Sequence, residues 1–99
     1  MRISDIVWKD RIVEKLGEKH AVSTDEVEEA LLSNPVIRRA ARGHAPGEDV
    51  YAAMSQIESG RRLIVFFIHK KRGVALPISA RDMSRSERRY YDKNEKKKA

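Results

Sequence analysis

Residues 63–68 read Leu-Ile-Val-Phe-Phe-Ile, six successive apolar side chains that are rich in β-branched and aromatic types. A strand with only one buried face alternates apolar and polar residues, whereas a continuous apolar strand must be covered on both faces. We therefore expect residues 61–69 to form the central strand of a sheet. Ser59 and Gly60 before the run, and residues 70–73 (KKRG) after it, are typical of chain reversals.

The segments on either side of this run supply the other strands. Residues 36–41 and 50–57 are β-prone and are separated by a turn at residues 44–47 (HAPG), and residues 74–79 follow the central strand. Pro77 cannot donate a backbone hydrogen bond, so we expect residues 74–79 to lie at a sheet edge or to end there. A short β-prone run at residues 3–8 begins the chain. Trp8, Phe66 and Phe67 are expected in the core.

Three segments carry helix signals. Residues 10–20 place Ile12, Val13 and Leu16 on one face, and capping boxes at residues 23–26 (STDE) and 84–87 (SRSE) start two further helices. The resulting order, β-α-α-β-β-β-β-α, predicts an α+β domain in which an antiparallel meander has two N-terminal helices against one face and a third helix closing the chain. Tyr90 and Tyr91 are adjacent on this third helix, so we expect one ring in the core and the other exposed for stacking.

Charge is distributed unevenly along the chain. Residues 1–50 hold eight cations and ten anions, whereas residues 51–99 hold thirteen cations and five anions. A field of this shape attracts polyanions, so nucleic acid is the first partner to consider and an anionic membrane surface the second. We expect one domain over residues 1–93 and a basic flexible tail over residues 94–99, which contains Lys96, Lys97 and Lys98.

Composition narrows the class of protein further. The chain has no cysteine, which excludes disulfides and thiolate metal sites. The longest apolar run is too short to span a bilayer, so a cytoplasmic protein without membrane residence is expected. His44 with Glu48 and Asp49 in one turn is too small a ligand set to predict a metal site, and neither a metal nor a cofactor is expected.

Several short motifs follow one another along most of the chain. They are Trp8 in an N-terminal strand, residues 19–22 (KHAV) with Asp25, Glu26, Glu29 and Ala30, residues 47–49 (GED), Gly60 and Arg61 before an apolar strand, and residues 78–81 (ISAR) with Glu87, Arg88 and Tyr91. Their order and spacing resemble the BrnT-type toxins of bacterial toxin–antitoxin pairs, which are small ribonucleases with a RelE-like fold. Three residues depart from that pattern. Leu76 stands where many relatives have a basic residue, and Ser55 and Ile57 replace an expected glycine and threonine.

The resemblance implies an endoribonuclease toxin that is neutralised by a cognate antitoxin, a ribbon-helix-helix DNA-binding protein encoded beside it. It leaves the assembly open between a homo-oligomer and a toxin–antitoxin heterotetramer. The alternative is a non-catalytic RNA- or protein-binding module of the same fold, in which Leu76 marks the loss of a catalytic cation.

Metal-independent RNA cleavage needs a base for the ribose 2′-hydroxyl, cations for the charge on the phosphorane, and an acid for the leaving oxygen. His20 is the natural proton carrier because imidazole titrates near neutral pH. Arg61 and Arg81 suit bidentate phosphate contact, and Tyr91 is expected to donate a proton or to stack on a base. These four residues are the candidate catalytic set. The candidate RNA-binding residues are Lys19, Lys70, Lys71, Arg72, Arg85 and Arg88.

Each catalytic candidate also has a structural interpretation. His20 suits the C-terminal end of a helix, where the dipole favours a cation, and Arg61 has Glu58 as a nearby partner. Arg81 precedes a helix N-terminus, where a cation opposes the dipole, so we expect a compensating anion from within the fold or from a bound phosphate. We expect the cations to share one groove between the sheet and the last helix, formed by Arg61, Arg62, Lys70, Lys71, Arg72, Arg81, Arg85 and Arg88.

Overall fold

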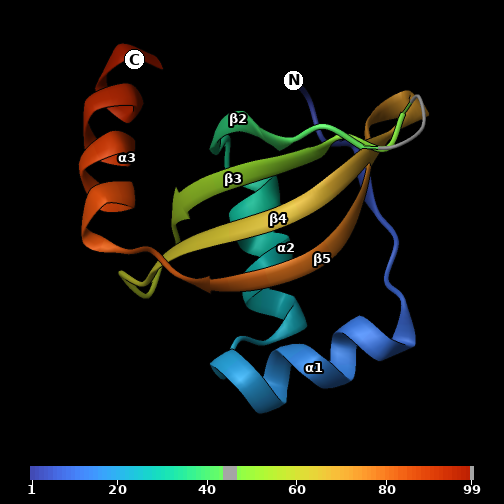
Figure 1. Cartoon of the computed structure of the whole chain (residues 1–99). Coiled ribbons are helices and arrows are strands. Elements are labelled where there is room, and N and C mark those ends of the chain that lie inside the picture. The colour runs from blue at the N-terminus through green and yellow to red at the C-terminus, as the bar shows by residue number, and fades with distance from the viewer. Residues whose placement is uncertain (44–46, 99) are drawn as a thin grey trace.

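The computed structural model describes residues 1–43 and 47–98, except for the side chains of residues 96–98 (Figure 1). Its elements are β1 (Asp5–Ile6), α1 (Asp10–His20), α2 (Thr24–Leu32), β2 (Val36–Ala41), β3 (Val50–Gln56), β4 (Arg62–Lys70), β5 (Val74–Asp82) and α3 (Arg85–Lys98), with one 3₁₀ turn at Lys71–Gly73. The turn expected at residues 44–47 lies mostly outside the described residues. Within the part that is described, no helix is both long enough and apolar enough to cross a membrane.

The sheet has five strands in the order β1-β5-β4-β3-β2. Strands β2 to β5 form the expected antiparallel meander, and β4 lies at its centre as its continuous apolar sequence indicates. The N-terminal run adds only the two-residue strand β1, which pairs in parallel with β5, so the sheet is mixed. The α+β class and the meander are thus confirmed.

The expectation for the strand that contains Pro77 was wrong in one respect. Strand β5 lies between β1 and β4 and continues to Asp82, so it is not an edge strand along its whole length. The described pairing with β1 covers only Val74 and Ala75, however, and the register against β4 shifts between Phe66 and Phe67. Pro77 therefore lies beyond the residues that pair with β1 and beside a bulge. The sheet needs no backbone N–H group at this position, so the proline costs no hydrogen bond between strands.

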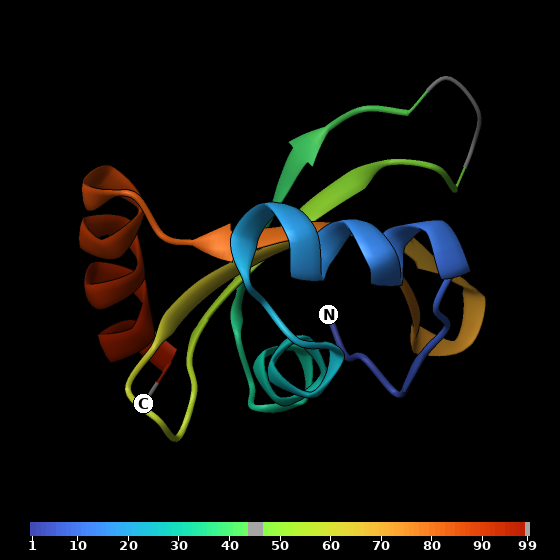
Figure 2. The same ribbon diagram turned by 90° about the horizontal axis from the view of Figure 1, so that it is seen from below.

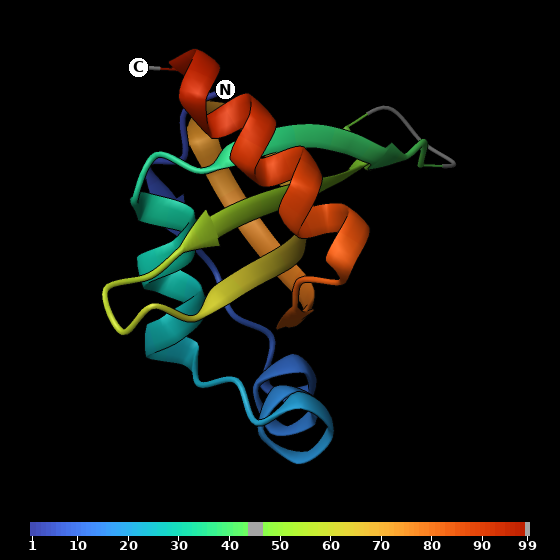
Figure 3. The same cartoon turned by 90° about the vertical axis from the view of Figure 1, so that its left-hand side faces the viewer.

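Two clusters of buried side chains hold the layers together. The larger cluster fills the face covered by α1 and α2 and includes Leu31, Leu63, Val65 and Phe67. The smaller cluster fills the opposite face, where Met54, Ile64 and Met83 are buried under α3. Figure 2 shows α2 and α3 on opposite sides of the sheet, and Figure 3 shows α3 running across the strands. Because both faces of β4 are covered, its apolar residues are buried on each side.

The three aromatic residues assigned to the core from the sequence are buried to different degrees. Phe67 has no exposed surface, whereas Trp8 and Phe66 are half-buried and pack against the larger and the smaller cluster respectively. The indole Nε1 of Trp8 donates to Oε2 of Glu28 at 2.8 Å, so this ring ties the N-terminal segment to α2.

Helix α3 begins at the expected capping box and corrects one expectation about its tyrosines. The Ser84 N–H donates to Oε1 of Glu87 at 2.8 Å, and the Glu87 N–H donates to Oγ of Ser84 at 3.3 Å. Tyr90 and Tyr91 are both half-buried against the smaller cluster, and neither is the free ring that was expected. The partly buried positions of α3 are residues 87, 90, 91 and 94, an i, i+3, i+4, i+7 stripe that includes two adjacent residues. The helix also continues past residue 93, into the segment assigned to a tail.

Candidate functional site

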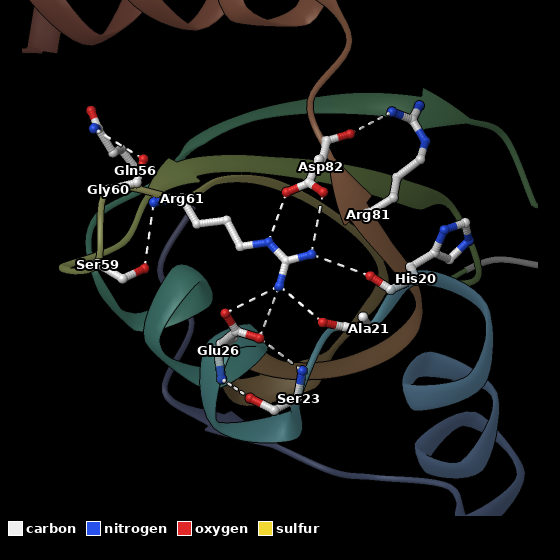
Figure 4. A network of polar contacts seen from close by, with 10 residues as sticks. All are labelled: His20, Ala21, Ser23, Glu26, Gln56, Ser59, Gly60, Arg61, Arg81 and Asp82. Atoms are coloured by element: carbon white, nitrogen blue, oxygen red, sulfur yellow. Dashed lines mark hydrogen bonds and ion pairs between the residues drawn. The ribbon is translucent and has the colours of Figure 1, made fainter.

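Arg61 lies where α1 ends, α2 begins, β4 begins and β5 ends, a meeting point that we call the junction (residues 20–26, 61–62 and 81–87). Its Nε and Nη2 atoms donate to the two carboxylate oxygens of Asp82 at 2.7 and 3.2 Å. Its Nη1 atom donates to the Ala21 carbonyl at 2.9 Å and to Glu26 at 3.1 Å, and Nη2 also donates to the His20 carbonyl at 3.2 Å (Figure 4). All five N–H groups of the guanidinium are used, so none is left for a phosphate.

The same contacts set the ionisation of the surrounding groups. Hydrogen bonding from Arg61 is the main cause that lowers the pKa of the Asp82 carboxyl. The pKa of Glu26 is lowered chiefly by the backbone N–H of Ser23 and then by Arg61. The pKa of Arg61 itself is raised, mainly by its hydrogen bond to Asp82. The partners of Arg61 are therefore Asp82 and Glu26, and the expected pairing with Glu58 was wrong.

Arg81 pairs with Glu87, which is the compensating anion expected from the position of Arg81 before a helix. Its Nη1 and Nη2 atoms donate end-on to the carboxylate of Glu87 at 2.7 and 2.9 Å, and Nη1 also donates to the Asp82 carbonyl at 3.2 Å. Hydrogen bonding from Arg81 lowers the pKa of Glu87 to about 2. Among the described contacts, Nε–H and the second Nη2–H of Arg81 have no acceptor. These two groups form one edge of the guanidinium, a bidentate fork that matches a phosphate.

His20 is the last residue of α1, as the structural interpretation expected, and its side chain is exposed at the end of β5. A small hollow of about 20 Å³ lies beside it, lined by Ile12, Lys15, Leu16, Lys19, His20, Ile78 and Ser79. Arg81 lies two residues beyond Ser79, roughly 7 Å further along the strand. The charge of His20 also contributes to the lowered pKa of Asp82, after the larger effect of Arg61. His20 and Lys19 thus lie on the face of β5 that α1 covers. The Arg81 guanidinium lies on the α3 side, 5.5 Å from the centroid of the Phe66 ring, so it is separated from them by the last residues of β5.

Tyr91 lies apart from this group. Its Oη atom accepts a hydrogen bond from the backbone N–H of Gln56, the last residue of β3, at 3.3 Å. Strand β3 is separated from β5 by β4, and two strand spacings amount to about 10 Å. His20 ends α1, which packs on the sheet face opposite the one that Tyr91 contacts. The four candidate catalytic residues therefore do not form one cluster.

The expected groove that collects all the cations is contradicted by the topology. Lys70 ends β4, and Lys71 and Arg72 lie in the turn that leads to β5. We call these three residues the tip, whereas Arg81 lies near the far end of β5. Arg81 is seven positions after Val74, so the tip is about 23 Å from Arg81 along the strand. In Figure 1 the tip lies at the end of the sheet opposite α3. A strand of nine residues cannot bring its two ends into one site.

The cations at the junction end of the hairpin, and those on α3, also have distinct surroundings. Nη1 of Arg62 lies 3.2 Å from Oδ1 of Asp92, so it joins β4 to α3. Arg85 and Arg88 are exposed on α3, where the part of the chain that is described provides them no anionic partner. They are exposed to solvent, and they do not line the hollow beside His20.

Sequence reasoning missed two interactions that shape this region. Glu87 serves both as the capping residue of α3 and as the partner of Arg81, and only the first role has a local sequence signal. The guanidinium of Arg38 lies over the ring of Tyr90, 4.5 Å from its centroid, and no sequence signal indicated it.

The described residues contain no group of three histidine, aspartate or glutamate side chains close enough to hold a metal ion. The sequence matches no protein-family model, and no curated protein matches it significantly.

Proposed function

We propose that the protein is an RNA-binding, metal-independent endoribonuclease whose site lies at the end of β5. The observation that supports this proposal is the presence of three features on the two faces of β5, near the end of the strand that β1 does not cover. These are the exposed imidazole of His20, the ammonium group of Lys19, and an Arg81 edge with no described acceptor. An imidazole beside phosphate-binding cations is the minimum that cleavage at a ribose 2′-hydroxyl requires.

The reaction is a transesterification at phosphorus. The imidazole of His20 accepts the proton of the 2′-hydroxyl while the 2′-oxygen forms a bond to phosphorus. The bond from phosphorus to the 5′-oxygen then breaks, and a proton is delivered to that leaving oxygen, by the imidazolium or by water. The products are a 2′,3′-cyclic phosphate and a free 5′-hydroxyl, so the reaction requires no oxidant, metal or cofactor.

Arg81 and Arg61 have different roles in this scheme. The Nε–Nη2 edge of Arg81 binds a phosphate oxygen, and its end-on pair with Glu87 holds the guanidinium in place before RNA arrives. Arg61 is a positioning residue, because it holds the carbonyl groups of His20 and Ala21 and therefore fixes the end of α1. Its role is to orient the imidazole, not to contact the phosphate.

The biological setting that we propose is that of a toxin held inactive by an antitoxin. It rests on the motif resemblance and on the thirteen cations against five anions in residues 51–99. An inhibitor that covers the end of β5 excludes RNA from His20 and Arg81. Purified complex should therefore cleave no RNA, and release of the inhibitor should restore cleavage.

One observation favours a second candidate, a non-catalytic RNA-binding module. Of the four candidate catalytic residues, Arg61 is fully engaged within the fold and Tyr91 is distant, which leaves fewer groups for chemistry than the resemblance implies. In this reading the same cations bind RNA and His20 is only a contact.

Incubation of purified protein with RNA in EDTA separates the two candidates. Wild type should cleave, His20→Ala should lose about 100- to 10,000-fold in rate, and Arg81→Ala should lose about 100-fold or more. Lys9→Ala, which changes an exposed cation before α1, is the matched control and should retain the wild-type rate.

Unfolding midpoints measured on each variant show whether a lost rate reflects a lost fold. Salt-dependent RNA binding without cleavage by wild type would establish the binding module and overturn the enzyme. Unchanged cleavage by a folded His20→Ala protein would place the site elsewhere.

A further inference from the structure

The tip combines three successive cations with an open hollow. In the described part of the chain, the side chains of Lys70, Lys71 and Arg72 take part in no ion pair or hydrogen bond with another residue. A hollow of about 670 Å³ is lined by Gly47, His69, Lys70, Lys71, Arg72 and Val74. The Nε2 atom of His69 is buried there without a hydrogen-bond partner among the described residues. Unlike Arg61, Arg62 and Arg81, which pair with carboxylates, the tip cations have no carboxylate partner among the described residues.

The backbone of the tip is fixed in place. The N–H of Ser4 donates to the Gly73 carbonyl at 2.8 Å, and the parallel pairing of Asp5 with Val74 continues this contact. Gly73 has a φ of 75°, and a Cβ atom there would lie 2.8 Å from both the Arg2 carbonyl oxygen and Oγ of Ser4. The nearby carboxylate of Asp5 accepts the N–H of Ile6 at 2.9 Å and pairs with no tip cation. The cations are therefore presented on a preorganised turn, which lowers the entropic cost of binding a ligand.

We propose that the tip is a second phosphate-binding site, which holds the same RNA strand at a distance from the site at the end of β5. This inference rests on the proposed function in taking RNA as the ligand. Three cations without internal partners on a fixed turn complement a run of phosphodiesters. The separation of about 23 Å along β5 sets the length of RNA needed. At the rise of about 3.4 Å per nucleotide known for one strand of duplex DNA, a stacked strand covers this span in about seven nucleotides.

Occupation of two linked sites makes affinity depend on RNA length, because the second contact becomes intramolecular. The test measures the Kd of fluorescein-labelled RNA of 3, 6, 9 and 12 nucleotides by anisotropy at one salt concentration. For wild type, affinity should rise by about 10-fold or more between 6 and 9 nucleotides. The variant Lys70→Gln/Lys71→Gln/Arg72→Gln should bind the trinucleotide as wild type does and should lose this rise.

The matched control removes three exposed cations from elsewhere, Lys9→Gln/Arg11→Gln/Lys93→Gln. It loses the same charge and should retain the rise. Unfolding curves confirm that each variant is folded.

The outcomes separate this inference from the proposed function. A length threshold that depends on the tip, in a protein that cleaves no RNA, would support the tip site and overturn the nuclease. Cleavage with an affinity that the tip variant leaves unchanged at every length would overturn the tip site alone. A third outcome is that wild type, but not the tip variant, binds anionic lipid vesicles, while RNA affinity shows no length threshold. The ligand of the tip would then be a membrane surface, and the proposed RNA site at the tip would be overturned.

Discussion

The two ends of the β4–β5 hairpin each carry three cations, and the fold uses them in opposite ways. At the junction, Arg61, Arg62 and Arg81 all form ion pairs with carboxylates at 2.7–3.2 Å. At the tip, Lys70, Lys71 and Arg72 have no such partner among the described residues. The number of cations is the same at both ends. The number of engaged N–H groups therefore separates a structural cation from one that is free to bind a ligand.

Arg81 is intermediate between these two cases. Arg61 uses all five of its N–H groups, whereas Arg81 donates three hydrogen bonds and keeps one edge without a described acceptor. An arginine of this kind is both oriented by the fold and able to contact a phosphate. The comparison thus ranks the cations of the hairpin by their expected effects on stability and on RNA binding.

Replacement of Arg61 should have the largest effect on stability. Arg61→Ala leaves Asp82 and Glu26 without their shared partner and frees the end of α1, so the free energy of unfolding should fall by about 2–3 kcal/mol. Lys71→Ala at the exposed tip should change it by no more than about 0.5 kcal/mol. Urea unfolding of both variants measures the difference. Equal losses would contradict the division between paired and unpaired cations.

The Arg81–Glu87 pair should make stability depend on pH in the acid range. The pKa of Glu87 is lowered from 4.5 to about 2 in the folded protein, so ionised Glu87 stabilises the fold above about pH 4.5. This contribution should be lost as the pH falls from about 4.5 to about 2. Glu87→Gln should lower the melting temperature at pH 7 and should flatten its decline across this window. Glu14→Gln, on the exposed side of α1, is the control and should decline as wild type does.

Local signals were sufficient for much of the fold. The capping boxes at Ser23 and Ser84 fixed two helix starts because both hydrogen-bonding partners lie within three residues. The apolar run of β4 identified the central strand because a strand buried on two faces has apolar residues at successive positions. No local sequence signal indicated the partners of Arg61, since Glu26 and Ala21 lie 35 and 40 residues away along the chain.

Two errors about the candidate site have different physical origins. The single groove was wrong because the nine residues of β5 hold the tip and Arg81 apart, a consequence that strand length alone predicts. The free tyrosine was wrong because the buried stripe of a helix includes adjacent positions, so both Tyr90 and Tyr91 contact the sheet. The contribution of Glu87 to Arg81 needed the structure, because it links a strand end to the helix that follows it.

Replacement of Tyr91 should have a small effect on both stability and RNA cleavage. Its Oη atom accepts one exposed hydrogen bond from Gln56 at 3.3 Å, so Tyr91→Phe should lower the free energy of unfolding by about 0.5 kcal/mol. RNA cleavage should be nearly unchanged, because the hydroxyl lies far from His20. Single-turnover rates of this variant and of wild type provide the measurement. A loss of 100-fold without unfolding would return Tyr91 to the catalytic set.

The salt dependence of RNA binding tests most directly whether unpaired cations bind RNA while paired ones build the fold. Each phosphate contact to single-stranded RNA contributes a slope of about −0.7 to a plot of log affinity against log salt concentration. With a 12-nucleotide RNA, replacement of Lys70, Lys71 and Arg72 by Gln should make the slope shallower by about 2. Arg62→Gln, which removes a cation paired with Asp92, should leave the slope unchanged. A tip variant with the wild-type slope, or an Arg62→Gln variant whose slope falls by about 0.7, would contradict the account.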